Sequence, residues 1–291
     1  MSGDAMKIID AHAHLGHRPR GLDALVESGV FEQIWLMDLS GCPAVDVRDL
    51  ATREEVLEVA GRYDGFFLAF GFVDLDEGAP GDVDRLRDLG FVGLKPYKPR
   101  FPWGDERYFP FYERAERLGM PVLFHTGLVA RGLPHGRGRP HGYGPDNMRP
   151  CHLAGVAEAF PDLTVLSGHM GYPHLEETWH NLYYYPNIYM DVSGYARSID
   201  TLREALDRRA HDGTDRYFND KILFSTDTCY GYDPDAGHAR ALRLASFWQL
   251  YFEFVGGLYY RWGRPEEKVK IFRDNARNLG ASFGKPPGER L

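Results

Sequence analysis

Cysteine is scarce in this 291-residue chain, and Cys42, Cys151 and Cys229 lie far apart. This spacing excludes a disulfide-stapled domain and a thiolate metal site, and it indicates a reducing, cytoplasmic compartment. Cationic residues are also in deficit, since 34 Lys+Arg face 42 Asp+Glu and the net charge is −8, which argues against nucleic acid as a partner. No run of about 18 apolar residues occurs, so we expect no membrane span. The first residues also lack the cationic start and apolar stretch of a signal peptide.

What the sequence does contain is an alternation of short apolar runs and longer helical patterns. Runs rich in β-branched and aromatic residues are typical of strands buried on both faces. Eight such runs occur, at 7–10, 33–37, 66–71, 91–95, 121–125, 163–167, 187–192 and 221–225. Helical patterns occur between them at 108–118, 151–160, 174–185, 199–210, 239–255 and 265–275, and Thr52 with Glu55 forms a capping box before another.

Eight strands with intervening helices predict a single domain, an α/β fold of the (β/α)8 TIM barrel type over residues 1–291. A doubly wound sheet is the alternative, but no Gly-rich phosphate loop follows the first strand. The longest connection, residues 126–150, is rich in Gly, Pro, Arg and His. We interpret it either as a cationic lid over an anionic substrate or as a flexible loop exposed to solvent. The segment 284–291 is interpreted as an extended or disordered tail.

Polar residues follow several of the strands, at the barrel end where chemistry takes place. His12 and His14 come after the first run, and a period of two places them on the same face. The fifth, sixth and eighth runs end with His125, His169 and Asp227. Each residue alone is equally consistent with a polar group in a turn. Together they predict an open metal site with three or four ligands, in which Asp227 binds the ion, accepts a proton from water, or does both.

Three further residues are candidates for binding a substrate. Lys95 ends the fourth run and either extends into solvent or holds a substrate carboxylate as a point charge. Tyr97 lies at the same rim, and Arg131 in the long loop has the planar fork that suits carboxylates. Asp191, at the end of the seventh run, either orients a ligand histidine from behind or caps a turn.

These residues resemble the amidohydrolase superfamily, in its amidohydrolase-2 branch, which contains aminocarboxymuconate-semialdehyde decarboxylase. The matching pieces occur in the family's order from residue 10 to residue 277: Asp10-Ala11-His12-Ala13-His14, Gly93-Leu94-Lys95, Phe124-His125-Thr126-Gly127, Gly168-His169-Met170-Gly171, Phe224-Ser225-Thr226-Asp227 and Asp274-Asn275-Ala276-Arg277. The resemblance implies a barrel that holds one divalent ion, most often zinc.

By this resemblance, the ligands of the ion are His12, His14, His125 and Asp227, and His169 handles protons beside it. Other superfamily members bind two ions bridged by a carboxylated lysine, and Lys95 would be that residue here. We expect one ion, with two ions as the alternative.

The resemblance also implies an enzyme that acts on a small molecule. We favour a metal-dependent hydrolase that attacks an amide, lactone or ester of a carboxylated or cyclic compound, because His12 is retained where several decarboxylases of the branch have Glu. One alternative is a non-oxidative decarboxylase of an unsaturated or aromatic acid, and another is a barrel that binds a metal or ligand without catalysis. The aromatic-rich stretch 247–262 predicts either a helix buried on the barrel wall or a homodimer contact.

Overall fold

The computed structural model describes residues 6–42, 49–127, 144–193, 219–232, 237–261 and 266–289. Within them the strands form one parallel sheet in the order β8-β7-β6-β5-β4-β3-β2-β1-β9. The strands are β1 (Ile8–Leu15), β2 (Phe31–Met37), β3 (Phe67–Gly71), β4 (Gly93–Leu94), β5 (Val122–Phe124), β6 (Val165–Ser167), β7 (Ile188–Asp191), β8 (Ile222–Leu223) and β9 (Cys229–Tyr230). The eight predicted strands are therefore all present, and β9 is an addition that the sequence did not predict.

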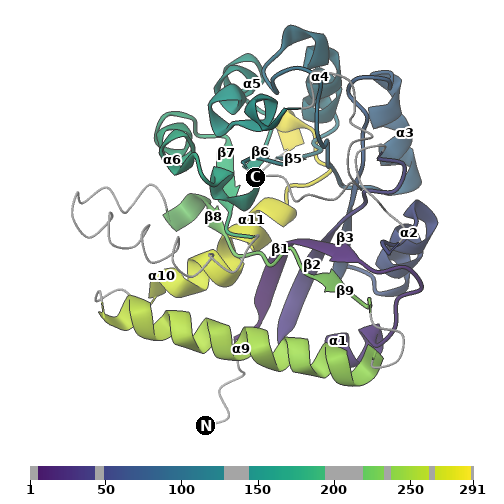
Figure 1. The fold of residues 1–291 in the computed structure, drawn as a ribbon, viewed down its shortest axis with the longest axis vertical. Coiled ribbons are helices and arrows are strands. Elements are labelled where there is room, and N and C mark those ends of the chain that lie inside the picture. Colours follow the sequence, from purple (N-terminus) through teal and green to yellow (C-terminus); the bar gives the residue numbers. More distant parts are fainter. Residues whose placement is uncertain are drawn as a thin grey trace.

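The sheet curls round until the chain that follows β8 meets β1. The backbone N–H of Ala11 donates to the carbonyl oxygen of Phe224 over 3.0 Å, and that of His14 donates to Thr228 over 2.9 Å. The short β9 then pairs with the end of β1. This closure gives the TIM barrel that was predicted (Figure 1), and it brings the first and last strand ends side by side.

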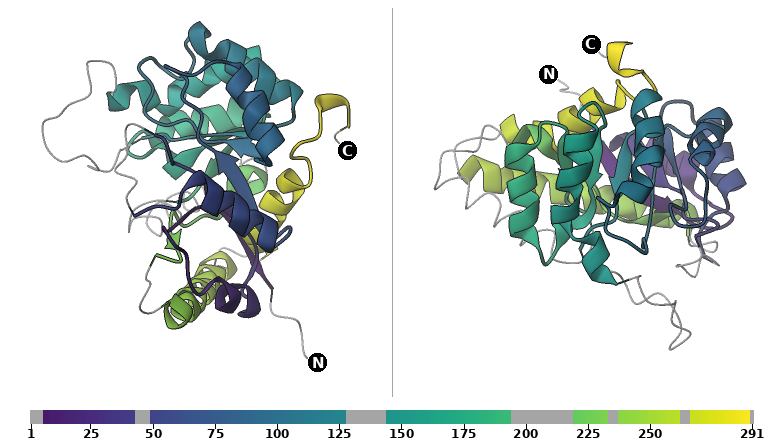
Figure 2. Two further views of the ribbon diagram at one scale, coloured as in Figure 1. Left: turned by 90° about the vertical axis from the view of Figure 1, so that its right-hand side faces the viewer. Right: turned by 90° about the horizontal axis from the view of Figure 1, so that it is seen from above.

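Helices surround the barrel (Figures 1 and 2). The capping box is present, because the Thr52 hydroxyl accepts from the Glu55 N–H and the Glu55 carboxylate accepts from the Thr52 N–H. A π-helical segment, Lys270–Asp274, interrupts the predicted helix 265–275, and the predicted helix 199–210 lies outside the described residues. The helices are α1 (Leu22–Glu27), α2 (Arg53–Arg62), α3 (Gly81–Leu89), α4 (Phe109–Arg117), α5 (Leu153–Ala159), α6 (Leu175–Tyr184), α9 (Gly237–Arg261), α10 (Glu266–Val269) and α11 (Asn275–Gly280). In the described part of the chain, none is long and apolar enough to cross a membrane.

The core has an inner and an outer layer. Alternate residues of the strands fill the barrel interior, among them Ile9, Trp35, Leu123 and Leu166. The residues between them form a larger layer that packs against the helices. Strands buried on both faces account for the near-continuous apolar runs in the sequence.

Candidate metal centre and active site

A change of register in β1 turns its two histidines into the barrel mouth. Ile9 and Ala11 face the interior, so strict alternation would point His12 at the helices. The pairing of β1 with β2 shifts between Asp10 and Ala13, and Ala13 accordingly belongs to the outer layer. A bulge of this kind re-aims side chains beside functional sites. The sequence predicted that the histidines share a face, but the bulge decides which face it is.

The Nδ1 atoms of both histidines are held by acceptors. His14 Nδ1 lies 2.9 Å from the carbonyl oxygen of Met37, and His12 Nδ1 lies 2.9 Å from Asp191 Oδ2. A carbonyl and an ionised carboxylate only accept, so each Nδ1 carries the proton and each Nε2 carries the lone pair. Those Nε2 atoms lie 3.7 Å (His12) and 3.2 Å (His14) from Asp227 Oδ1. His12, His14 and Asp227, called the outer group below, are therefore placed to bind one cation.

Asp227 is held in an unusual backbone conformation. Its φ is 55°, which a residue other than glycine adopts at a cost and which clusters at functional sites. Its N–H donates to the carbonyl oxygen of His12 over 2.8 Å. The preceding Thr226 donates its N–H and its hydroxyl to the buried Asp10 carboxyl over 3.0 and 2.6 Å. Asp10 thus anchors the loop that presents Asp227, a role that the sequence did not reveal.

The charge of Asp227 is stabilised although its surroundings are mostly protein. Burial favours the neutral acid, but the contact with His14 and the nearby His169 and His12 hold the pKa of Asp227 well below its usual value. Its side chain is 35% exposed, against 13% for His14 and 0% for His12. The outer group is therefore an ionised site with one side open to solvent.

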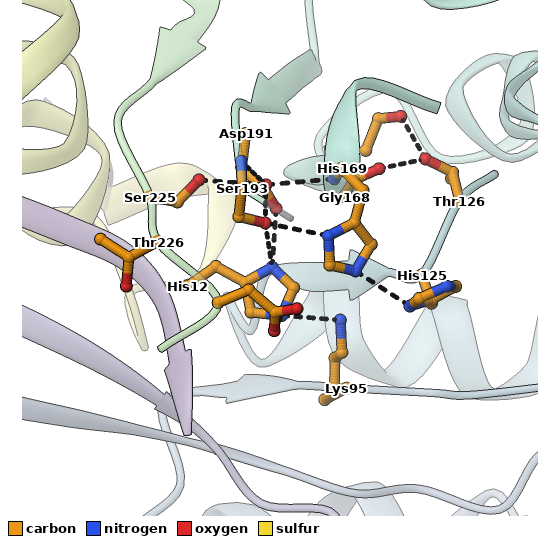
Figure 3. A network of polar contacts seen from close by, with 12 residues as sticks. His12, Lys95, His125, Thr126, Gly168, His169, Asp191, Ser193, Ser225 and Thr226 are labelled. Atoms are coloured by element: carbon orange, nitrogen blue, oxygen red, sulfur yellow. Dashed lines mark hydrogen bonds and ion pairs between the residues drawn. The ribbon is translucent and has the colours of Figure 1, made fainter. Parts of the chain in front are cut away.

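Asp191 lies at the opposite, closed side of His12 and is fully buried (Figure 3). Its Oδ1 accepts from the His169 N–H, the Ser193 N–H, the Ser193 hydroxyl and the Ser225 hydroxyl at 2.5 to 3.1 Å. Burial would raise the pKa of Asp191, but the attraction and the hydrogen bond of the His12 ring hold it far below its usual value. His12, His169 and Asp191, called the inner group below, also satisfy the distances of a metal site.

A chain of hydrogen bonds leads from Asp191 to His125 (Figure 3). The Ser193 hydroxyl gives its one proton to Asp191, so its oxygen accepts from His169 Nδ1 at 3.0 Å. His169 Nε2 then carries a lone pair, and His125 Nδ1, 3.0 Å away, must donate to it. This leaves the lone pair of His125 on Nε2, as in His12 and His14. Ser193 was not among the predicted site residues, and its place two residues after Asp191 was the signal in the sequence.

Lys95 is buried rather than extended into solvent. It is 1% exposed, and its Nζ lies 3.2 Å from His12 Nε2. Burial lowers the pKa of Lys95 to about 8, against the attraction of Asp191 and Asp227. Its position after β4, among interior-facing residues, leaves it no route along the outer surface, so the solvent interpretation is wrong.

Of the other residues and segments predicted from the sequence, the structure describes some and leaves others outside the described residues. The Tyr97 ring packs edge-on against the His125 ring, with centroids 4.8 Å apart. Arg131 and residues 128–143 of the predicted lid lie outside the described residues. Arg149, near the end of that loop, binds Glu177 through its Nε over 3.0 Å. In the predicted tail, the N–H of Gly284 donates to the carbonyl oxygen of Gly119 over 2.9 Å.

Solved structures share this architecture at low sequence identity. An uncharacterised TIM-barrel protein, Bb4693 from Bordetella bronchiseptica, aligns with a TM-score of 0.66 and 21% identity, covering 96% of this chain and 100% of that one. The 5-carboxyvanillate decarboxylase LigW from Sphingomonas paucimobilis aligns at 0.58 and 14%, covering 94% and 99%. An amidohydrolase from Mycoplasma synoviae aligns at 0.53 and 14%, covering 98% and 91%. These likenesses establish the fold.

The family is established by the sequence itself. A search of curated proteins finds no match. The family model described as Amidohydrolase (Amidohydro_2), however, matches residues 9–279, which include β1 from its second residue, the bulge and every residue of both donor groups. This chain belongs to the Amidohydrolase family, as its resemblance predicted.

Proposed function

We propose that this protein is a metal-dependent hydrolase that attacks the carbonyl of an amide, lactone or ester in a small carboxylated or cyclic molecule. The observation that carries the proposal is the outer group, in which the Nε2 atoms of His12 and His14 converge on Asp227 Oδ1 while their Nδ1 atoms are held from behind. Ligand histidines of catalytic metals have this arrangement of proton and lone pair.

The donor set fits one divalent ion, for which zinc is the leading candidate. Imidazole nitrogen and carboxylate oxygen suit zinc and similar metals. We assign His12, His14, His125 and Asp227 as its ligands, since each histidine carries its lone pair on Nε2. When bound, such an ion supplies a Lewis acid that polarises a carbonyl and lowers the pKa of water.

The chain's own residues have separate tasks in this proposal. Asp227, held ionised, accepts a proton during attack on the carbonyl. His169 handles protons at Nε2, where it carries a lone pair. The Lys95 ammonium contacts the same His12 lone pair that would hold an ion, so with an ion in place Lys95 would be available to a substrate carboxylate. We assign Tyr97 and Arg131 to substrate binding as well.

A second candidate is decarboxylation of an unsaturated or aromatic acid. It is supported by the fold shared with LigW, a 5-carboxyvanillate decarboxylase, and by a lysine beside the metal ligands that suits a carboxylate. In the third candidate, a barrel that binds metal without turnover, Asp227 would be a ligand only, and the lysine beside the metal ligands would have no substrate to bind.

One set of measurements separates the three candidates. Metal analysis of the purified protein is expected to give one divalent ion per chain, which His14→Ala loses and which His180→Ala, altered on the exposed part of α6, retains. A substrate panel in ¹⁸O-labelled water is expected to give labelled product without CO2. Release of CO2 without label would establish the decarboxylase, metal without turnover would leave a binding barrel, and absence of metal would refute all three.

A further inference from the structure

The barrel closes in an unusual way between β8 and β1. Within the described residues every other pair of neighbouring strands shares a hydrogen-bonded ladder, but no ladder joins these two. Leu223 accepts from Val192 on the β7 side of β8, so the backbone groups of Ile222 and Phe224 face the β1 side. Ala11 of β1 donates to the Phe224 carbonyl oxygen. The Ile222 carbonyl and the Phe224 N–H therefore need partners outside β1, because buried backbone groups are costly to leave unpaired.

The π-helical segment Lys270–Asp274 supplies the partner of the Phe224 N–H. An α-helix would join the N–H of Asn275 to the carbonyl oxygen of Ile271, four residues before it. Here that N–H donates to the carbonyl oxygen of Lys270, five residues before it. The Ile271 carbonyl is thereby released from the helix, and it accepts from the Phe224 N–H over 2.9 Å. The wider turn thus converts a helical carbonyl group into a partner for the strand.

The side chain of Asn275 supplies the partner of the Ile222 carbonyl. Its Nδ2 donates to that oxygen over 2.8 Å and to the carbonyl oxygen of Asn219 just before β8. The Phe272 ring also stacks on the Phe224 ring, with centroids 4.4 Å apart and planes at 19°. This part of the chain, between α10 and α11, lies beside β1 and β8 in Figure 1. It therefore holds the end of β8 by backbone, amide and ring contacts.

Phe224 begins the run 224–227, which ends at the assigned metal ligand Asp227. The two residues between them are bound to buried carboxyl groups, and the Asp227 N–H donates to the carbonyl oxygen of His12 over 2.8 Å. The left-handed φ of Asp227 leaves its backbone little freedom to adjust. A shift of Phe224 would therefore move the Asp227 carboxylate away from His14 Nε2, which lies 3.2 Å from it.

We propose that Asn275 is a positioning residue of the metal centre and acts together with the π-helical segment before it. By holding β8 where it meets β1, they place the Asp227 carboxylate opposite the Nε2 atoms of His12 and His14. The proposal rests on the function proposed above only in taking Asp227 as a metal ligand. The hold on residues 224–227 belongs to the metal-free chain as well.

Asn275→Ala and Asn187→Ala form a matched pair of variants. Asn187 Nδ2 likewise donates to backbone carbonyl groups, but these lie in α5 and its connection to β6, at 3.0 to 3.3 Å. Both variants leave carbonyl groups unpaired and should lose similar stability in urea. The zinc dissociation constant, measured by competition with a chelator, should rise about tenfold or more in Asn275→Ala. In Asn187→Ala it should stay at its natural value.

Hydrogen exchange of the metal-free proteins tests the same hold without zinc. The amide protons of Phe224 and Asp227 should exchange about tenfold faster in Asn275→Ala than in Asn187→Ala, because only the first variant frees the end of β8. Circular dichroism checks that each variant folds. If Asn275→Ala unfolds, Asn275→Ser replaces it, since the serine hydroxyl still donates to one of the two carbonyl oxygens.

The outcomes separate this proposal from the proposed function. Equal zinc constants, or equal exchange rates of these two amides, in the Asn275 and Asn187 variants would overturn the positioning role and leave the metal site standing. A natural chain that binds no divalent ion would refute the proposed function instead. The exchange rates would then decide alone whether Asn275 holds residues 224–227.

Discussion

The inner and outer groups share His12 and satisfy the same distances, yet they are not equivalent as metal sites. In the inner group the donor atoms are already engaged, since Asp191 binds His12, Ser193, Ser225 and the His169 backbone. In the outer group the lone pairs converge from one side and Asp227 is partly exposed. Proximity of ligand-type residues is therefore insufficient to define a metal site; the direction of each lone pair decides.

Two buried carboxyl groups near these sites differ in the direction of their pKa shifts. Asp10 and Asp191 are both 0% exposed. Burial raises the pKa of Asp10 to about 7, because its partners are hydroxyls and backbone N–H groups. Asp191 faces His12 and His169, and their effect drives its pKa in the opposite direction. The neighbouring imidazole groups, rather than burial, thus separate a carboxyl group that stays charged from one that titrates near neutrality.

The largest expected effect is on stability, and it belongs to the inner group. Asp191→Ala leaves His12, Ser193 and Ser225 without their hydrogen-bond acceptor in a buried site. This change should lower the free energy of unfolding by about 3–5 kcal/mol. Asp227→Ala removes a partly exposed carboxylate and should cost about 1 kcal/mol or less. Urea unfolding of the metal-free proteins measures both. Equal losses in the two variants would remove the distinction between the groups.

The next effect is on metal affinity, and it belongs to the outer group. Asp227→Asn removes a ligand and should weaken zinc binding by more than about 100-fold, whereas removal of an orienting partner costs about 10–100-fold. Asp191→Asn, which keeps the shape of the side chain, should therefore weaken binding less than Asp227→Asn does. Competition with a chelator gives both constants. The reverse order would assign the ion to the inner group.

The barrel could be predicted from sequence because each strand repeats the same signal, an apolar run closed by a polar residue. The residues that meet at the site, His12, His14, His169 and Asp227, followed from that rule. Their arrangement did not, because the bulge after Asp10 and the left-handed φ of Asp227 depend on pairing with the distant chain after β8. The burial of Lys95 depends equally on closure of the barrel, which brings His12 to its Nζ.

A smaller effect is expected from Ser193, which connects the two groups. Without its hydroxyl, His169 loses the acceptor that holds the proton on Nδ1, and His125 Nδ1 loses its defined partner in turn. Ser193→Ala should mix the tautomers of His169 and His125, seen in ¹⁵N NMR of the metal-free protein, and weaken zinc binding about tenfold. Ser193→Thr keeps a hydroxyl and should keep the natural tautomers. Unchanged ring ¹⁵N shifts in Ser193→Ala would show that the hydroxyl does not set them.

The smallest expected effect is a change in how stability depends on pH, and it sharpens the contrast between Asp10 and Asp191. In the folded protein Asp10 keeps its proton up to a pKa of about 7, whereas the unfolded chain releases it near 3.8. Between these values the folded state binds more protons, so the Asp10 contribution to stability falls as pH rises and levels off above 7. Asp10→Asn should remove this loss. As the pH rises from 6 to 7, the unfolding free energy of the variant should therefore increase by about 1 kcal/mol relative to that of the natural chain. Urea unfolding of the two metal-free proteins at both pH values measures the gain, and parallel pH profiles would mean that Asp10 is ionised throughout, like Asp191.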